Sequence, residues 1–83
     1  MAKAVIIGIY IEDRIKEAGE IQKILTEFGC SIKTRLGLHE AGNTCSPSGI
    51  ILLELTGAKA EWEKFEVKLK GIAGVQIQKL EFV

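Results

Sequence analysis

The N-terminal part of the chain changes from a dense apolar stretch to apolar residues at helical spacing. Lys3 to Ile11 is rich in Val and Ile, is too short for a typical helix, and is apolar at odd and even positions alike. This pattern predicts a central β-strand. Asp13 can cap a helix after it, and Gly29 suits the position after the last turn. The apolar positions of that helix are Ile15, Ala18, Ile21, Leu25 and Phe28.

The middle of the chain predicts two strands separated by a loop. From Ser31 to Leu38 the pattern alternates, which is typical of a strand with one face in water. Its apolar side would carry Ile32, Thr34, Leu36 and Leu38. The segment from His39 to Ser48 is rich in turn-forming residues and is expected to be a loop. Gly49 to Thr56 is apolar on both faces and predicts a second central strand.

The C-terminal part predicts a second amphipathic helix and a last strand. Ala58, Trp62, Phe65, Leu69 and Ile72 recur at helical spacing, and Gly71 and Gly74 favour an end to this helix. Val75 to Phe82 has strand-like alternation whose phase changes at Lys79. We therefore expect a bulge or a twist near Lys79.

The order of these elements is strand, helix, strand, strand, helix, strand. With right-handed crossovers it predicts an α+β, ferredoxin-like βαββαβ sandwich whose antiparallel four-stranded sheet has the order 4-1-3-2. The hydropathy agrees, because the first and third strands are apolar on both faces. A chain of 83 residues and 9.1 kDa has room for one such domain, residues 1–83.

Charge and hydropathy narrow the partners and the location. Eleven basic and eleven acidic residues give a formal net charge of zero, so the basic excess typical of direct nucleic-acid binding is missing. Apolar runs fall far short of the roughly 20 residues of a membrane helix, and the first one lacks the flanks of a signal peptide. We expect a cytoplasmic protein with no membrane contact. No residue pattern identifies a cofactor.

The predicted architecture leaves one face of the sheet without helices. The first strand would present either Val5, Ile7, Ile9 and Ile11 or Ala4, Ile6, Gly8 and Tyr10 to that face. Both sets are largely apolar, and soluble monomers avoid large exposed apolar patches. We therefore expect a homodimer or homotetramer that forms through the open sheet face, and the alternative is a monomer with a moderately apolar open face.

His39 and Cys45 lie six positions apart in or beside the expected loop. Imidazole and thiolate together suit zinc, nickel or copper, with Glu40 as a possible third ligand. This makes a transition-metal site one hypothesis. A second is a thiol enzyme with Cys45 as nucleophile and His39 as base, and the simplest alternative is a surface histidine near an inert thiol.

Two arginines lie where a subunit interface could form a pocket. Arg14 follows the first strand, and Arg35 lies on the second strand. We expect these residues, with Tyr10 and His39, to face an anionic or amino-acid-like ligand.

Several short motifs resemble those of the ACT-like group of small regulatory domains. They are Ile11-Glu12-Asp13-Arg14, Arg35-Leu36-Gly37, Gly49 with the apolar strand after it, and Lys68-Leu69 leading to Ile72-Ala73-Gly74-Val75. The chain looks most like the family of regulators of the iron-only hydrogenase system. The resemblance implies a non-enzymatic, self-associating regulatory or sensor module with a small ligand at a subunit boundary.

The chain is also similar to the metal-binding regulatory domain of the nickel-responsive repressor. His39 and Cys45 match the spacing of a strand-borne histidine and a cysteine that help to bind nickel across a subunit interface in that domain. Gly37 stands where the repressor has another histidine. This resemblance implies a transition-metal-binding module as the alternative function.

Overall fold

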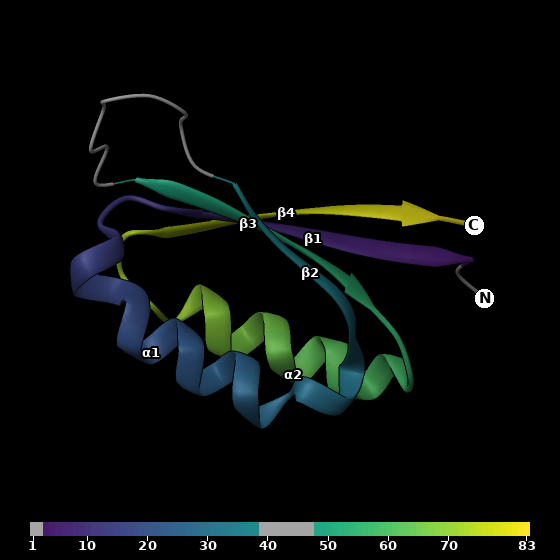
Figure 1. The fold of residues 1–83 in the computed structure, drawn as a ribbon. Helices are drawn as coiled ribbons and strands as arrows, with labels where there is room; N and C mark the ends of the chain where they lie inside the picture. The colour runs from purple at the N-terminus through teal and green to yellow at the C-terminus, as the bar shows by residue number, and fades with distance from the viewer. Residues whose placement is uncertain (1–2, 39–47) are drawn as a thin grey trace.

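The computed structural model describes residues 3–38 and 48–83 and shows two helices on one side of a four-stranded sheet (Figure 1). The predicted helices and strands are all present, with bounds within a few residues of those expected. In chain order they are β1 (Ala4–Ile11), α1 (Arg14–Glu27), the short 3₁₀ helix η1 (Gly29–Ser31), β2 (Ile32–Leu38), β3 (Gly49–Leu55), α2 (Lys59–Lys70) and β4 (Val75–Phe82).

The sheet is antiparallel throughout and has the order β2-β3-β1-β4. Counted from the other edge, the same neighbours run β4-β1-β3-β2, so the two strands predicted to be central, β1 and β3, are central. This is the arrangement of a ferredoxin-like fold, in which each helix connects two strands that are not neighbours.

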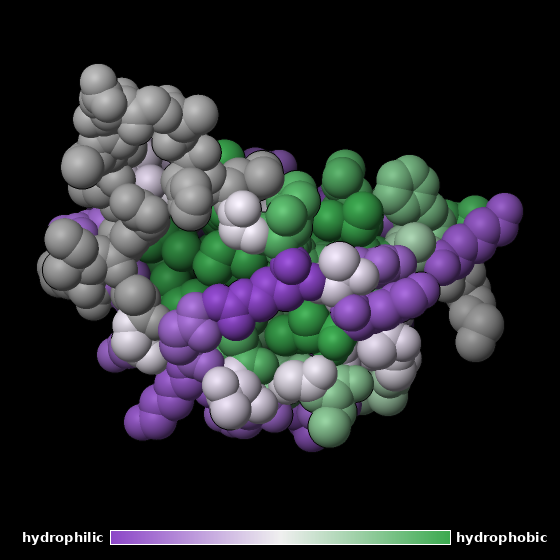
Figure 2. Space-filling model, in the orientation of Figure 1, coloured by the Kyte–Doolittle hydropathy of each residue, from purple (hydrophilic) through white to green (hydrophobic). Residues whose placement is uncertain are grey.

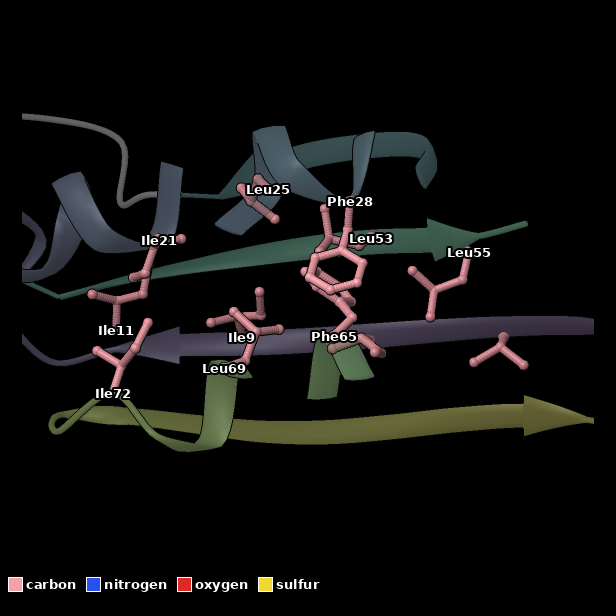
Figure 3. Packing of buried hydrophobic residues seen from close by; sticks show 12 residues of the cluster. Ile9, Ile11, Ile21, Leu25, Phe28, Leu53, Leu55, Phe65, Leu69 and Ile72 are labelled. Carbon is pink, nitrogen blue, oxygen red and sulfur yellow. The ribbon is translucent and has the colours of Figure 1, made fainter. Parts of the chain in front are cut away.

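The core lies between the sheet and the two helices (Figure 3). Side chains from β1 and β3 meet side chains from α1 and α2 there, and Phe28 packs on Phe65 with 5.3 Å between ring centroids. The buried apolar residues are Val5, Ile7, Ile9, Ile11, Ile21, Leu25, Phe28, Leu53, Leu55, Phe65, Leu69 and Ile72. Both helices therefore direct their apolar stripe at the same face of the sheet, as their spacing predicts.

Trp62 is partly buried against this core, which agrees with its predicted place on the apolar side of α2. Its indole Nε1 donates a hydrogen bond to the carbonyl oxygen of Thr56, with 2.7 Å between the two atoms. An indole that is apolar on one side and hydrogen-bonded at its edge suits the boundary between core and solvent. Trp62 thus links the start of α2 to the end of β3.

The alternation predicted for β2 is interrupted by a register shift between Ile32 and Thr34. Ile32 is the partner of Leu55, whose side chain is in the core, whereas Thr34 is the partner of Glu54 on the other face. The prediction that Ile32 shares a side with Thr34 and Leu36 is therefore wrong. The extra residue, Lys33, lets Ile32 pack on the core while the rest of the strand turns its even-numbered residues away from the helices.

Of the bulge or twist expected near Lys79, the bulge is absent, because β4 pairs with β1 in unbroken register from Ala4↔Phe82 to Ile11↔Val75. The shift of the apolar residues of β4 from odd to even positions after Ile77 has another cause. Val75 and Ile77 face the helices, whereas at Lys79 the helix side of β4 is occupied by an ion pair with Glu66 of α2 at 3.4 Å. The apolar residues of the second half of β4 consequently lie on the opposite face.

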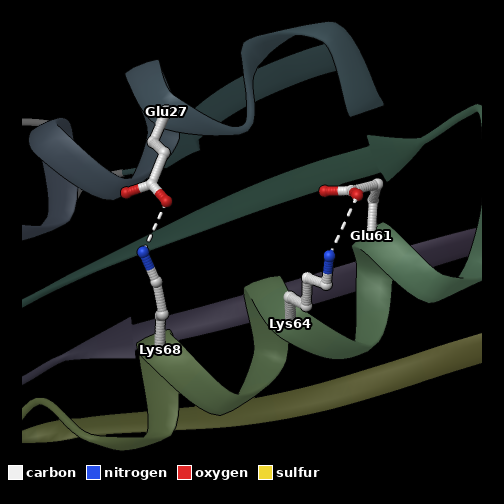
Figure 4. Close-up of polar contacts among 4 residues, drawn as sticks. All are labelled: Glu27, Glu61, Lys64 and Lys68. Carbon is white, nitrogen blue, oxygen red and sulfur yellow. Dashed lines mark hydrogen bonds and ion pairs between the residues drawn. The ribbon is translucent and has the colours of Figure 1, made fainter.

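Ion pairs lie on the exposed surface of the helices, one between the helices and one within α2 (Figure 4). Lys68 of α2 contacts the carboxylate of Glu27 on α1, and Lys64 lies 3.4 Å from Glu61 within α2. These side chains are all substantially exposed, so the helix surface is a mixed-charge, solvated face. No helix in the described part of the chain is both long and apolar enough to span a membrane.

Candidate functional site

The face of the sheet opposite the helices is exposed and mostly apolar. Strand register decides its composition, because alternate residues face the same side and Cα partners share a face. From β1 it carries Ala4, Ile6, Gly8 and Tyr10; from β3, Ile50, Leu52 and Glu54; from β2, Thr34 and Leu36; and from β4, Gln76, Gln78, Leu80 and Phe82. We call this set the open face.

Exposed large apolar side chains gather on the open face. Five of them belong to it: Tyr10 (40% exposed), Leu36 (52%), Ile50 (39%), Leu80 (58%) and Phe82 (52%). In Figure 2, apolar atoms are visible above the strands, on the side away from the helices. The structure thus selects the second of the two β1 sets considered from the sequence, and the prediction of an apolar open face is confirmed.

A shallow depression of about 230 Å³ lies on the open face around Gly8. Gly8 has Leu52 and Gln78 as Cα partners on its two sides, and its missing side chain leaves the space. The lining residues are Gly8, Tyr10, Ile50, Gln76 and Gln78. The depression is therefore apolar at its base and along β3, with polar groups from β1 and β4.

These polar groups can donate and accept hydrogen bonds without carrying charge. Gln76 and Gln78 are exposed, and each side-chain amide has two N–H donors and a carbonyl acceptor. The hydroxyl of Tyr10, the Cα partner of Gln76, adds one donor and one acceptor. The exposed surface of the depression itself is nevertheless almost wholly apolar, so it suits a small ligand whose apolar part enters it and whose polar groups meet Gln76, Gln78 or Tyr10 at the margin.

The one charged side chain of the open face lies beside β2, away from the depression. Glu54 accepts a hydrogen bond from the hydroxyl of Thr34 (3.1 Å between oxygens) and lies 3.9 Å from the amine of Lys33. Its carboxylate therefore has a hydrogen-bond donor and a nearby cation on β2. The other residues of the open face have no charged side chain.

Two of the predicted ligand residues, Tyr10 and Arg35, lie on opposite faces of the sheet. Tyr10 is the partner of Ile50 on the open face, whereas Arg35 is the partner of Leu53, whose side chain is in the core. Arg35 is exposed because β2 is an edge strand. Within one subunit they do not form one site, so a ligand that touches both requires residues of two subunits.

Of the remaining predicted site residues, the structure describes the position of Arg14 only. Arg14 is the first residue of α1. His39 and Cys45, with Glu40, lie outside the described residues, and the predicted metal site stays a prediction. Residues 3–38 and 48–83 contain no group of three or more His, Cys, Asp or Glu side chains placed to hold a metal ion.

Sequence reasoning did not single out four of the residues around the depression: Gly8, Ile50, Gln76 and Gln78. A signal for Gly8 was available, because a glycine inside an apolar strand often marks a close approach or a missing side chain. The two glutamines alternate with Val75 and Ile77 and looked like ordinary solvent-facing residues. Only the pairing of β4 with β1 brings them beside Gly8.

Comparison with known proteins bears on the fold alone. No family model matches the chain, and no curated protein matches it. Among solved structures, it is similar to that of the uncharacterized protein TM1266 from Thermotoga maritima, with 24% sequence identity, a TM-score of 0.82, and coverage of 100% of both chains. The likeness supports the arrangement of the described helices and strands and, at this identity, nothing beyond the fold.

Proposed function

We propose that this chain is a non-enzymatic, ACT-like regulatory or sensor module that self-associates through its open face and binds a small ligand at the resulting subunit boundary. The observation that carries the proposal is the apolar open face with the Gly8 depression inside it. Regulation of an iron-only hydrogenase system, which the sequence resemblance implies, is part of the proposal.

The exposed area supports self-association of moderate strength. Five large apolar residues are each roughly half exposed, and with about 150–250 Å² for a full aromatic side chain as the upper reference they present on the order of 400 Å². This reaches the size of the largest, often functional, apolar patches on monomers, about 300–600 Å². Two such faces would bury roughly 1,000 Å², near the lower limit for specific interfaces, so the assembly should depend on concentration.

The size of the depression supports a ligand held between subunits. Ligand pockets usually have volumes of about 300–1,000 Å³ and enclose most of the ligand. The depression of about 230 Å³ is open to solvent and smaller than that range. A second subunit laid over it would add a roof, and the ligand would then stabilise the assembly over separated chains.

Replacement of Leu36 by Glu tests the face contact. Leu36 is exposed in the middle of β2, so the variant should keep the fold and place a charge in the interface. Light scattering after size exclusion should show a lower mass for Leu36→Glu than for the unmodified chain. Val67→Glu is the matched control, because Val67 is 71% exposed on α2, away from the open face.

An unchanged mass for Leu36→Glu at every concentration would refute the face contact. The ligand is tested separately, by a thermal-shift screen of amino acids, nucleotides and divalent metals on the unmodified chain. A specific ligand should raise the melting temperature and favour the larger species in the same samples. If no compound does both, the ligand part of the proposal fails.

A further inference from the structure

The strand β4 forms an edge of the sheet, beyond which the described residues place no further strand. It spans eight residues without a bulge. Proteins commonly shorten, bend or cover such edges, because a row of unpaired N–H and C=O groups can pair with another chain. A long, regular edge is therefore a potential pairing surface.

Two hydrogen bonds show which backbone groups of β4 point outward. The carbonyl of Phe82 accepts from the N–H of Lys3 (2.6 Å), and the carbonyl of Gly74, just before β4, accepts from the N–H of Glu12 (2.9 Å). Even-numbered residues thus direct their backbone toward β1. Because the direction alternates along a strand, the free edge is formed by the N–H and C=O groups of Val75, Ile77, Lys79 and Glu81.

The second half of this edge is also apolar on the side of the open face. Leu80 (58% exposed) and Phe82 (52%) are two of the exposed large apolar residues and lie in the second half of β4, on the open face. Lys79 and Glu81 flank Leu80 on the helix side, and their charged groups are 4.0 Å apart. The edge therefore offers exposed apolar side chains and two opposite charges, two residues apart.

From this pattern we infer that β4 pairs antiparallel with β4 of a second copy of the chain, with Leu80 opposite the partner's Leu80. This register places Lys79 opposite the partner's Glu81 and Glu81 opposite the partner's Lys79, so two favourable charge pairs form on the helix side. Both are outward-facing positions and can exchange N–H···O=C bonds across the edge. The inference extends the proposed self-association to the β4 edge of the sheet, which adjoins the open face and shares Leu80 and Phe82 with it.

In this register a two-fold axis passes between the two Leu80 residues, and both the charges and the outward-facing backbone groups favour it over neighbouring registers. Moving the two-fold axis of the pair by one residue places either Lys79 opposite the partner's Lys79 or Glu81 opposite the partner's Glu81, where like charges oppose pairing. Moving it by two places both charges opposite apolar residues, Lys79 beside the partner's Ile77. With Leu80 on the axis, the two Leu80 side chains meet at a position without cross-strand hydrogen bonds, where side chains are closest.

Pairing at this edge would leave the open face accessible. A two-fold axis perpendicular to the sheet keeps both pairs of helices on one side and joins the two open faces into one continuous surface. That surface could then stack on another through the face contact. The edge contact and the face contact together would produce a tetramer with two kinds of isologous interface.

Charge reversal at positions 79 and 81, made in chains that carry Leu36→Glu, tests the edge contact without the face contact. The Leu36→Glu chain should be dimeric, and adding Glu81→Lys should weaken the dimer roughly tenfold or more, because Lys79 would then face lysine twice. Adding Lys79→Glu instead should weaken it similarly. An equal mixture of these two double variants should restore a dimer, because both cross-strand pairs are again of opposite sign.

Sedimentation velocity gives the masses, and circular dichroism checks that each variant is folded. The mixing step is needed because Lys79 also pairs with Glu66, so a loss caused by damage within one chain would not be rescued by mixing. The edge contact is refuted if the Leu36→Glu chain is monomeric, if Glu81→Lys leaves its dimer unchanged, or if the mixture stays monomeric. A Leu36→Glu chain with the full mass of the unmodified assembly would refute the face contact instead.

Discussion

Gly8 and Leu52 are Cα partners on the two central strands, and a Cβ atom at position 8 would lie 3.5 Å from Cδ2 of Leu52. This is ordinary van der Waals contact, so the strand pairing does not require glycine here. The φ of Gly8 is also outside the positive range seen for Gly57 and Gly74. The absence of a side chain at position 8 therefore matters to the surface, where it leaves the depression open.

Replacement of Gly8 by Val should abolish ligand binding without loss of stability. The side chain would occupy the depression, whereas folding should be unchanged or improved, since a substitution that fits removes entropy from the unfolded chain, worth about 0.4–1 kcal/mol. The measurements are the thermal-shift response to any compound found in the screen and the melting temperature without it. Gly8→Ala should have an intermediate response. A full ligand response in Gly8→Val would place the ligand elsewhere.

Gly74 should be costly to replace. Its φ is +80°, a region that costs an L-residue roughly 1–2 kcal/mol, and a Cβ would lie 3.2 Å from Oε1 of Glu17. Gly57 has φ +82° with no neighbouring atom within 4 Å, so Gly57→Ala reports the backbone cost alone. Urea denaturation should show a loss for both alanine variants, at least as large for Gly74→Ala.

Gly29 supplies the control for this pair. It has no positive φ, and a Cβ there would meet nothing within 4 Å. Gly29→Ala should leave the free energy of unfolding nearly unchanged. Equal stability of all three alanine variants would show that the turn before β4 and the turn before α2 relax without cost.

Lys68 should stabilise the contact between the helices only slightly. Its amine contacts Glu27 and lies 5.6 Å from the centroid of the Phe28 ring, but about half of each charged side chain is exposed. Lys68→Met should lower the free energy of unfolding by about 1 kcal/mol or less, and Glu27→Gln, which removes only the ion pair, by less. Urea denaturation at low and high salt checks this, because only the ion-pair part is screened. A loss above about 3 kcal/mol, the level of a broken buried pair, would contradict this view.

The metal-binding alternative makes a separate prediction. If His39 and Cys45 hold a transition metal, purified protein should contain zinc, nickel or copper in fixed ratio to the assembly, and Cys45→Ser should lose it. Elemental analysis before and after dialysis against a chelator measures this. Cys30→Ser is the matched control, because Cys30 is exposed at η1 and is not part of the predicted site. Metal-free protein that regains no metal on incubation with these ions would remove this alternative.

Local pattern was a good guide wherever one residue's environment depends on its neighbours in sequence. Helical spacing placed Phe65 and Leu69 in the core, and the dense apolar stretches identified β1 and β3 as central. Register was harder to predict. The bulge is at Lys33 and not near Lys79, because each strand's phase is decided by the residues opposite it: Leu55 for Ile32, and Glu66 of α2 for Lys79.

The sequence alone determined the order of elements, the two-layer fold and the presence of an apolar surface with no helix to cover it, since these follow from periodicity and from the chirality of connections. It left open which of the two alternating sets of β1 residues forms that surface, because both sets are apolar. Tertiary structure decided this by burying Val5, Ile7, Ile9 and Ile11 under the helices and leaving Gly8 and Tyr10 outside. It also separated Tyr10 from Arg35 and brought Gln78 beside Gly8, since a face is shared only through cross-strand pairing, which depends on residues far apart in the chain.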